Sequence, residues 1–222
     1  MIRMIMSDGK DVAVYHVEPS GERKGGLVLI QEIFGVTDHI RELAQEYAAD
    51  GYEVLAPGLF DREAPGFECD YTGPDFERAV KLARELHPFD LSVKDAQTCV
   101  DALKGKGPVF MTGYCYGGSI TWRMAQLSDD LAAASSYYGS LVPTMFKDQA
   151  PKCATIAHFG RYDAGIPMDG VEALIALAHP TAQIFVYDAN HGFNSDRRKD
   201  YHAESSDLAR ERTLGLFRAC GG

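Results

Sequence analysis

The stretch that decides the fold is Val109–Met124, which reads VFMTGYCYGGSITWRM. Its first three residues, Val109 to Met111, form a short apolar run typical of a buried strand, and its last residues have helical spacing. Between them Gly113 and Gly117 flank Cys115, where the chain has to reverse in a cramped turn. A strand, a sharp turn and a helix in this order form the pattern of a nucleophile elbow, with cysteine where hydrolases more often carry serine.

Two interpretations of Cys115 follow from this pattern. At the tip of an elbow its side chain is exposed at the carboxyl end of the sheet, and the start of the following helix favours a thiolate. Alternatively, Cys115 is a small buried hydrophobic residue beside a glycine turn, as many free cysteines are. The rest of the chain has to decide between a nucleophile and a packing residue.

Length and charge limit the class of protein. A chain of 222 residues suits one domain, so we expect residues 1–222 to form a single unit. The formal net charge of −10 argues against nucleic acid and against anionic membranes as partners. No apolar run approaches the length of a membrane span, and the polar Ser7-Asp8-Gly9 interrupts the N-terminal apolar residues too early for a signal peptide.

The cysteines are odd in number, scattered and without a C-x-x-C pair: Cys69, Cys99, Cys115, Cys153 and Cys220. This usage fits a reducing compartment better than a disulfide framework, and no zinc-binding spacing occurs. The glycine-rich segment also lacks both phosphate-binding patterns, G-x-x-x-x-G-K-[ST] and G-x-G-x-x-G at a strand-to-helix turn. We therefore expect a cytoplasmic protein that needs no metal and no organic cofactor.

Strand and helix patterns alternate along the chain. The expected strands are 2–6, 12–17, 27–30, 52–56, 109–111, 132–138, 153–159 and 183–187. The expected helices start at Thr37 or Asp38, at Pro74 and after Cys115, and cover 91–103, 171–178 and 205–218. Most of the strands are wholly apolar, which predicts an α/β protein whose mostly parallel sheet has helices on both faces. A long loop at 59–73 is expected to border a site.

A cysteine nucleophile needs a base, and the base needs an orienting acid. In this architecture both follow the nucleophile in the chain, each just beyond a strand. Asp163 and His191 satisfy that order. Asp163 could instead be a turn or capping residue, and Asp188 is a rival acid, although it sits awkwardly close to His191 on one strand end. The other six histidines are expected to be structural or solvated: His16, His39, His87, His158, His179 and His202.

Over nearly its whole length the sequence resembles the dienelactone hydrolase family of α/β-hydrolases. The matching pieces are Gln31–Gly35, Arg62–Gly66, Gly113–Gly118, Tyr137–Gly139, the segment around Asp163, and His191–Phe193. The resemblance implies the α/β-hydrolase fold. It also implies that Cys115, Asp163 and His191 form the catalytic triad.

The resemblance gives roles to the turn after the strand at 27–30. In the family a glutamate at the position of Glu32 pairs with the resting thiol and is displaced as substrate binds, which helps to generate the thiolate. A surface acid in a loop is the alternative for Glu32. The backbone N–H groups of Ile33 and Tyr116 would form the oxyanion hole.

The sequence departs from the family at the substrate carboxylate. Members that hydrolyse dienelactone hold this group with two arginines, and Arg62 matches the first. The second falls four residues after the triad histidine, where this chain has Ser195, while Arg197 and Arg198 are nearby but out of register. Arg62 either binds a substrate carboxylate or is a solvated surface residue. Loss of one arginine should weaken and broaden recognition of a carboxylate.

These observations predict a cysteine-dependent hydrolase of ester or lactone bonds that acts through an acyl-enzyme. The expected partner is a small-molecule ester or lactone, possibly carboxylated, and the expected state is a monomer or a small homo-oligomer. A broader carboxylesterase or thioesterase with the same triad is the alternative within enzymes. A non-catalytic binding module is the alternative outside them.

Overall fold

The structure is a computed structural model that describes residues 1–222. Eight strands form one sheet in the order β1-β2-β4-β3-β5-β6-β7-β8. The strands are β1 (Ile2–Ile5), β2 (Asp11–Val17), β3 (Gly25–Ile30), β4 (Tyr52–Pro57), β5 (Val109–Tyr114), β6 (Ala133–Tyr137), β7 (Ala154–Gly160) and β8 (Ala182–Tyr187). Strands β3 to β8 run parallel, and β2 pairs antiparallel with both β1 and β4. The mostly parallel sheet predicted from the sequence is confirmed.

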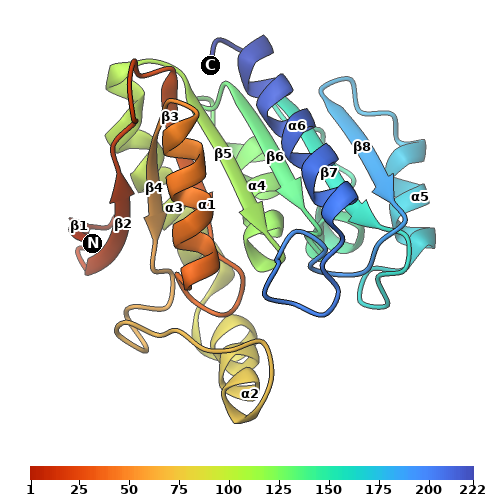
Figure 1. Ribbon diagram of the computed structural model, residues 1–222, viewed down its shortest axis with the longest axis horizontal. Helices are drawn as coiled ribbons and strands as arrows, with labels where there is room; N and C mark the ends of the chain where they lie inside the picture. Colours follow the sequence, from red (N-terminus) through yellow and green to blue (C-terminus); the bar gives the residue numbers. More distant parts are fainter.

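Helices cover both faces of the sheet, as Figure 1 shows. The principal helices are α1 (Asp38–Ala49), α2 (Pro74–Lys81), α3 (Phe89–Leu103), α4 (Tyr116–Leu127), α5 (Met168–Ala176) and α6 (Ala203–Ala219). Helices α1 and α6 lie in front of the sheet in that view, and α3 and α4 lie behind it. Because both faces are covered, β3, β4, β5 and β6 are buried at every position. Apart from Glu53 in β4, these strands accordingly consist of apolar, aromatic or small residues.

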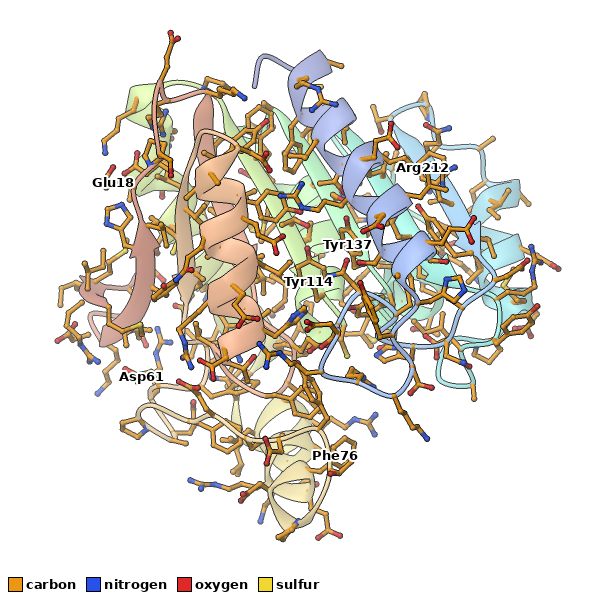
Figure 2. The ribbon with its side chains drawn as sticks, in the orientation of Figure 1. Glu18, Asp61, Phe76, Tyr114, Tyr137 and Arg212 are labelled. Carbon is orange, nitrogen blue, oxygen red and sulfur yellow. The ribbon has the colours of Figure 1, made fainter.

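Two apolar cores result from this layering. One of 29 buried residues contains the inward side chains of α1 and α6, and the other of 24 contains those of α3. Tyr114 and Tyr137 lie between α1 and α6 over the front of the sheet (Figure 2). The Tyr137 hydroxyl is 2.7 Å from the Thr213 hydroxyl of α6, so this helix is fixed to β6 by a buried hydrogen bond as well as by packing.

The segment between β4 and α3 projects beyond the body of the molecule. It contains the loop 58–73, helix α2 and a π-helical turn, Leu82–Leu86. An isolated antiparallel β-bridge between Gly35 and Glu68 holds this loop against the loop that follows β3. Gly35 has φ 89° there, and a Cβ atom would lie 1.9 Å from the Phe67 carbonyl oxygen, so only glycine fits. Phe76 on α2 is 40% exposed (Figure 2).

The structure refines several expectations. The predicted helix 91–103 begins earlier, at Phe89, and the last helix extends to Ala203–Ala219. Two histidines expected at polar positions, His39 and His87, are buried at 5% and 3% exposure, because their helix and loop pack against the body. None of the helices combines the length and the apolar composition that a membrane span requires.

Candidate active site

The candidate site residues lie where parallel strands end. Cys115 directly follows β5, Asp163 follows β7, His191 follows β8 and Glu32 follows β3. Since the carboxyl ends of parallel strands meet at one edge of the sheet, residues up to 159 positions apart converge there. Figure 1 shows this edge at the bottom of the sheet, where the loop before α6 also gathers.

The turn that carries Cys115 is strained and closely packed. Cys115 has φ 55° and ψ −112°, a conformation that non-glycine residues adopt only where the surroundings enforce it. A Cβ atom on Gly113 would meet the Gly117 carbonyl oxygen at 2.4 Å, and one on Gly117 would meet the Gln31 carbonyl oxygen at 2.5 Å. The glycines therefore let the start of α4 press against β3 and β5, which aims the Cys115 side chain out of the turn.

Cys115, His191 and Asp163 are joined by two hydrogen bonds. The Cys115 Sγ atom is 3.2 Å from His191 Nε2, and His191 Nδ1 is 2.6 Å from Asp163 Oδ2. The Asp163 side chain is fully buried, and its other oxygen accepts the Gly165 N–H at 2.8 Å. Cys115 and His191 are partly exposed, so a ligand can reach them while the acid beneath stays fixed.

Burial and charge act on His191 in opposite directions. Burial lowers the pKa of the imidazole, but the negative charges of Cys115 and Asp163 and their hydrogen bonds outweigh it and raise the pKa to about 10. The arrangement therefore favours a protonated imidazole at His191, with its Nε2 next to the Cys115 sulfur. A protonated imidazole in this position can donate a proton to a leaving group.

The rival acid and the other histidines lie elsewhere. Asp188 is 70% exposed and pairs with Arg161 at 2.7 Å, so its carboxylate faces solvent. His158 is fully buried in β7, where its ring nitrogens contact the hydroxyls of Tyr187 at 2.8 Å and Ser135 at 3.1 Å. Burial and the charge of Arg212 lower the pKa of His158 to about 3, so it is neutral and structural.

Glu32 lies inside the molecule, with a cation beside it. It is 1% exposed, and Arg198 Nη1 approaches its Oε1 at 3.4 Å. The Arg198 guanidinium also stacks over the ring of Tyr71 at 5.3 Å. It packs so closely on Gly192, next to His191, that a Cβ atom there would meet Arg198 Nε at 2.6 Å. Arg198 therefore lies between the buried carboxylate and the segment that carries the histidine.

Two backbone N–H groups are free at the same place. The N–H groups of Ile33 and Tyr116 donate to no carbonyl oxygen in the structure. Tyr116 is the first residue of α4, where N–H groups have no partner within the helix and the dipole favours negative charge. The loop that carries Ile33 is held by the Gln31 side chain, which accepts the Leu59 N–H at 3.2 Å.

Arg62 lies in a different environment from the one expected of a substrate-binding residue. Its guanidinium bonds Asp95 at 2.5 and 2.8 Å and Asp8 at 2.9 and 3.0 Å. Its side chain is 9% exposed, and that of Asp95 is fully buried. The structure does not bring Arg62 into contact with Cys115, His191 or Glu32. Its bonds instead connect the β1–β2 turn to α3, which favours a role in supporting the loop.

A polar cavity of about 720 Å³ adjoins Arg198 and Tyr71. Both residues line it, together with His39, whose helix α1 follows the Glu32 loop. Sequence reasoning gave no role to Tyr71 and placed Arg198 out of register. Ser195, which stands where the resemblance places the second arginine, is buried and donates a hydrogen bond to the Tyr71 hydroxyl at 3.1 Å. Arg198, three residues later in the chain, is the arginine that lines the cavity beside Tyr71.

One group of side chains has a spacing that could hold a metal ion, and it lies away from this site. His16, Glu18 and Glu53 bring their ligand atoms within 4.8 Å of one another on β2 and β4. The Glu53 carboxylate already binds Arg23 and Lys106, each at 2.8 Å. Two cations in the same place oppose the binding of a third, so these residues do not suit a metal.

Fold and site together define the class. The sheet order, the elbow and the residues at the strand ends are those of an α/β-hydrolase. A solved structure described as a candidate dienelactone hydrolase from Klebsiella pneumoniae matches with a TM-score of 0.82 and 30% identity, covering 97% of each chain.

The family follows from the sequence comparisons. The model of the dienelactone hydrolase family matches residues 12–221. A candidate carboxymethylenebutenolidase of Escherichia coli (strain K12) is 32% identical over 98% of this chain and 86% of its own length. The carboxymethylenebutenolidase of Pseudomonas putida is 30% identical over 86% of this chain and 84% of its own. The chain belongs to the dienelactone hydrolase family, and it is a dienelactone hydrolase-like hydrolase.

Proposed function

We propose that this protein hydrolyses ester or lactone bonds with Cys115 as nucleophile, His191 as general base and acid, and Asp163 as the orienting acid. The observation that carries the proposal is the pair of hydrogen bonds that joins these three residues, 3.2 Å and 2.6 Å long. The strained conformation of Cys115 at the start of α4 supports it, because strain of this kind is found mainly at functional sites.

The chemistry follows from the positions of the atoms. Cys115 Sγ attacks the carbonyl carbon while the proton of the thiol resides on His191. The oxyanion that forms accepts hydrogen bonds from the N–H groups of Ile33 and Tyr116. Collapse of this intermediate breaks the C–O bond, and His191 gives its proton to the departing oxygen. The product of this half is a thioester on Cys115, with an alcohol that remains tethered to the acyl group when the substrate is a lactone.

The second half releases the acid. His191 Nε2 removes a proton from water, and the hydroxide adds to the thioester carbonyl. The same two N–H groups donate hydrogen bonds to the new oxyanion. The C–S bond then breaks, and the Cys115 thiolate returns beside the imidazolium. Asp163 keeps the ring in the orientation in which Nε2 faces the sulfur throughout.

Glu32 is proposed to take part in forming the thiolate, as its position in the family implies. In this structure its contact is with Arg198 and not with Cys115, whose sulfur faces His191. This contact fits the state in which the carboxylate has moved away from the thiol. The burial of Glu32 supports a role in the site over that of a surface acid.

The substrate class follows from the available cations. Arg62 is occupied by Asp8 and Asp95, whereas Arg198 has one long contact with Glu32 and faces the polar cavity. We therefore propose a carboxylated ester or lactone whose negative charge meets Arg198. A neutral ester or a thioester is the second candidate, because a single arginine holds a carboxylate less tightly than two.

The test is direct observation of the acyl-enzyme. We expect a burst of p-nitrophenol from p-nitrophenyl acetate, and a mass increase of one acetyl group on the peptide that contains Cys115. Cys115→Ala should abolish both, while Cys69→Ala, which removes a thiol near the cavity, should preserve them. Steady hydrolysis by Cys115→Ala at the wild-type rate would refute the assignment of the nucleophile.

Alkylation supplies an independent measurement. Burial raises the pKa of the thiols of Cys99 and Cys153, and that of Cys69 rises to about 11. Iodoacetamide should therefore label Cys115 before these three, and activity should fall in step with its labelling. Full activity after complete modification of Cys115 would contradict the mechanism.

A further inference from the structure

The side chain of Tyr116 connects the turn that carries Cys115 to helix α3. Tyr116 is the first residue of α4 and is 9% exposed. Its hydroxyl lies 3.0 Å from the hydroxyl of Ser92, which is 0% exposed. This is the only hydrogen bond between α3 and α4, although the two helices share one apolar core behind the sheet (Figure 1).

Two aromatic rings pack against the Tyr116 phenol. Phe89, the first residue of α3, meets it edge-on with ring centroids 5.7 Å apart. Phe60, in the loop after β4, has its ring centroid 5.8 Å away. Burial raises the pKa of Tyr116 to about 12, so the phenol keeps its hydrogen at neutral pH. The ring is therefore held by packing, and the hydroxyl at its end is held by Ser92.

Ser92 is one of two buried polar residues in α3. The other is Asp95, three residues later, which bonds Arg62. Residues three apart lie on one face of a helix, so this face of α3 holds the Arg62 loop with one side chain and the start of α4 with the other. Burying a hydroxyl costs free energy unless it finds a partner, and Tyr116 is the partner of Ser92.

Two other hydrogen bonds of this turn tie its backbone to β6. The Cys115 N–H donates to the carbonyl of the last residue of β6 at 3.0 Å, and the Ser136 hydroxyl donates to the Gly118 carbonyl at 2.8 Å. Neither bond involves Tyr116. The residue whose backbone N–H is a proposed oxyanion donor is therefore anchored through its side chain, and the anchor is Ser92.

We propose that Ser92 is a positioning residue for the oxyanion hole, because its bond to the Tyr116 hydroxyl fixes the direction in which the Tyr116 backbone N–H points. The inference rests on the proposed function, in which this N–H donates to the oxyanion. Such a donor acts only when it meets the oxygen at about 2.7–3.1 Å, so a small rotation of the first turn of α4 weakens it. Ser92 makes no hydrogen bond to Cys115 or His191 and acts only through Tyr116.

The test compares two reactions of the same thiol. Acetylation of Cys115 by p-nitrophenyl acetate places a negative charge on the carbonyl oxygen, so this reaction needs the oxyanion hole. With dipyridyl disulfide the Cys115 sulfur attacks a sulfur atom instead. A mixed disulfide forms, thiopyridone leaves, and no oxygen becomes charged. Subtracting the reaction of Cys115→Ala isolates the contribution of Cys115 in both assays.

Tyr116→Phe and Ser92→Ala each remove the bond, and Tyr116→Phe also keeps the ring in its packing. We expect the acetylation rate to fall about 3- to 10-fold, as for the loss of one hydrogen bond, while the reaction with dipyridyl disulfide stays within about twofold of the wild type. A wild-type acetylation rate in either variant would overturn the inference. Equal losses in the two reactions would overturn it as well, because the bond would then support the thiol and not the oxyanion hole.

The double variant tests whether the two hydroxyls act as one. If they do, Ser92→Ala with Tyr116→Phe should acetylate within about twofold of the slower single variant, whereas losses that multiply would overturn the inference. Tyr137→Phe is the matched control, since it removes a buried hydroxyl that bonds Thr213 on the α6 side of the sheet (Figure 2). It should lower the melting temperature and leave both reactions of Cys115 unchanged. A similar loss of acetylation in Tyr137→Phe would overturn the inference, because the effect would then follow from the loss of any buried hydroxyl.

The wild-type protein separates this inference from the proposed function. A wild type that releases no burst of p-nitrophenol would refute the proposed function, and the inference with it. A wild-type burst that Ser92→Ala reproduces at full rate would refute the inference alone.

Discussion

Replacing Arg62 by alanine should destabilise the protein and should not change its preference for charged substrates. The side chain bonds Asp95 twice, at 2.5 and 2.8 Å, and the Asp95 carboxylate is fully buried. Burial raises the pKa of Asp95, and the hydrogen bonds and charge of Arg62 act against that effect. Without Arg62 the Asp95 carboxylate would be a buried charge with no cation beside it.

The size of the effect follows from this burial. Removing one partner of a buried ion pair costs about 3–5 kcal/mol, because the remaining charge stays desolvated. For a chain of this length each kcal/mol lowers the melting temperature by roughly 2–4 °C, so the expected decrease is roughly 6–20 °C. The partly exposed contact with Asp8 adds little, since solvent screens it.

Two measurements check this expectation. Thermal unfolding of Arg62→Ala should show the decrease, and Arg62→Ala with Asp95→Asn should recover part of it because the second change removes the buried charge. Hydrolysis of an acidic and a neutral ester of similar size should change by the same factor. A variant with wild-type stability that loses kcat/KM only on the acidic ester would refute the reasoning. Arg62 would then be a residue that binds the substrate carboxylate.

Three further predictions concern the site and the core. Asp163→Asn should fold normally and lose most of its kcat because the imidazole loses its orienting partner, whereas Asp188→Asn should change kcat little; the reverse ranking would move the acid to Asp188. Arg198→Gln should reduce kcat/KM for the acidic ester about tenfold more than for the neutral one, and equal losses would mean that Arg198 does not bind the substrate charge. The pKa of His158 is about 3 in the folded state and about 6.5 in the unfolded chain, so stability present above pH 6.5 should be lost as pH falls towards 3. The free energy of unfolding should fall by up to about 1.4 kcal/mol per pH unit in this range. For His158→Gln, urea unfolding at several pH values should show a weaker dependence of this free energy on pH.

The parts of the site that the sequence could predict are those fixed by short-range patterns. Cys115 is marked by flanking glycines, and Asp163 and His191 by their positions just past strands, so chain order alone places them at one edge of a parallel sheet. The strands were recognisable for a similar reason, because burial on both faces leaves continuous apolar runs. The π-helical turn Leu82–Leu86 and the burial of His39 had no such local signal.

The assignment of the arginines shows what local patterns miss. The partners of Arg62 lie 54 and 33 residues away, and Glu32 and Arg198 are separated by 166 residues, so no spacing in the sequence relates them.

We therefore propose that the positive charge that meets a substrate carboxylate is that of Arg198 and not that of Arg62. Arg62 is held by Asp8 on the β1–β2 turn and by Asp95 on α3. Arg198 stacks over the Tyr71 ring, packs against Gly192 and makes one long contact with Glu32. A substrate carboxylate that pairs with Arg198 competes with Glu32 for the same guanidinium. Under the proposed mechanism, binding of a charged substrate would then free the Glu32 carboxylate to take part in forming the Cys115 thiolate. We therefore expect substrate charge and nucleophile activation to be coupled through Arg198.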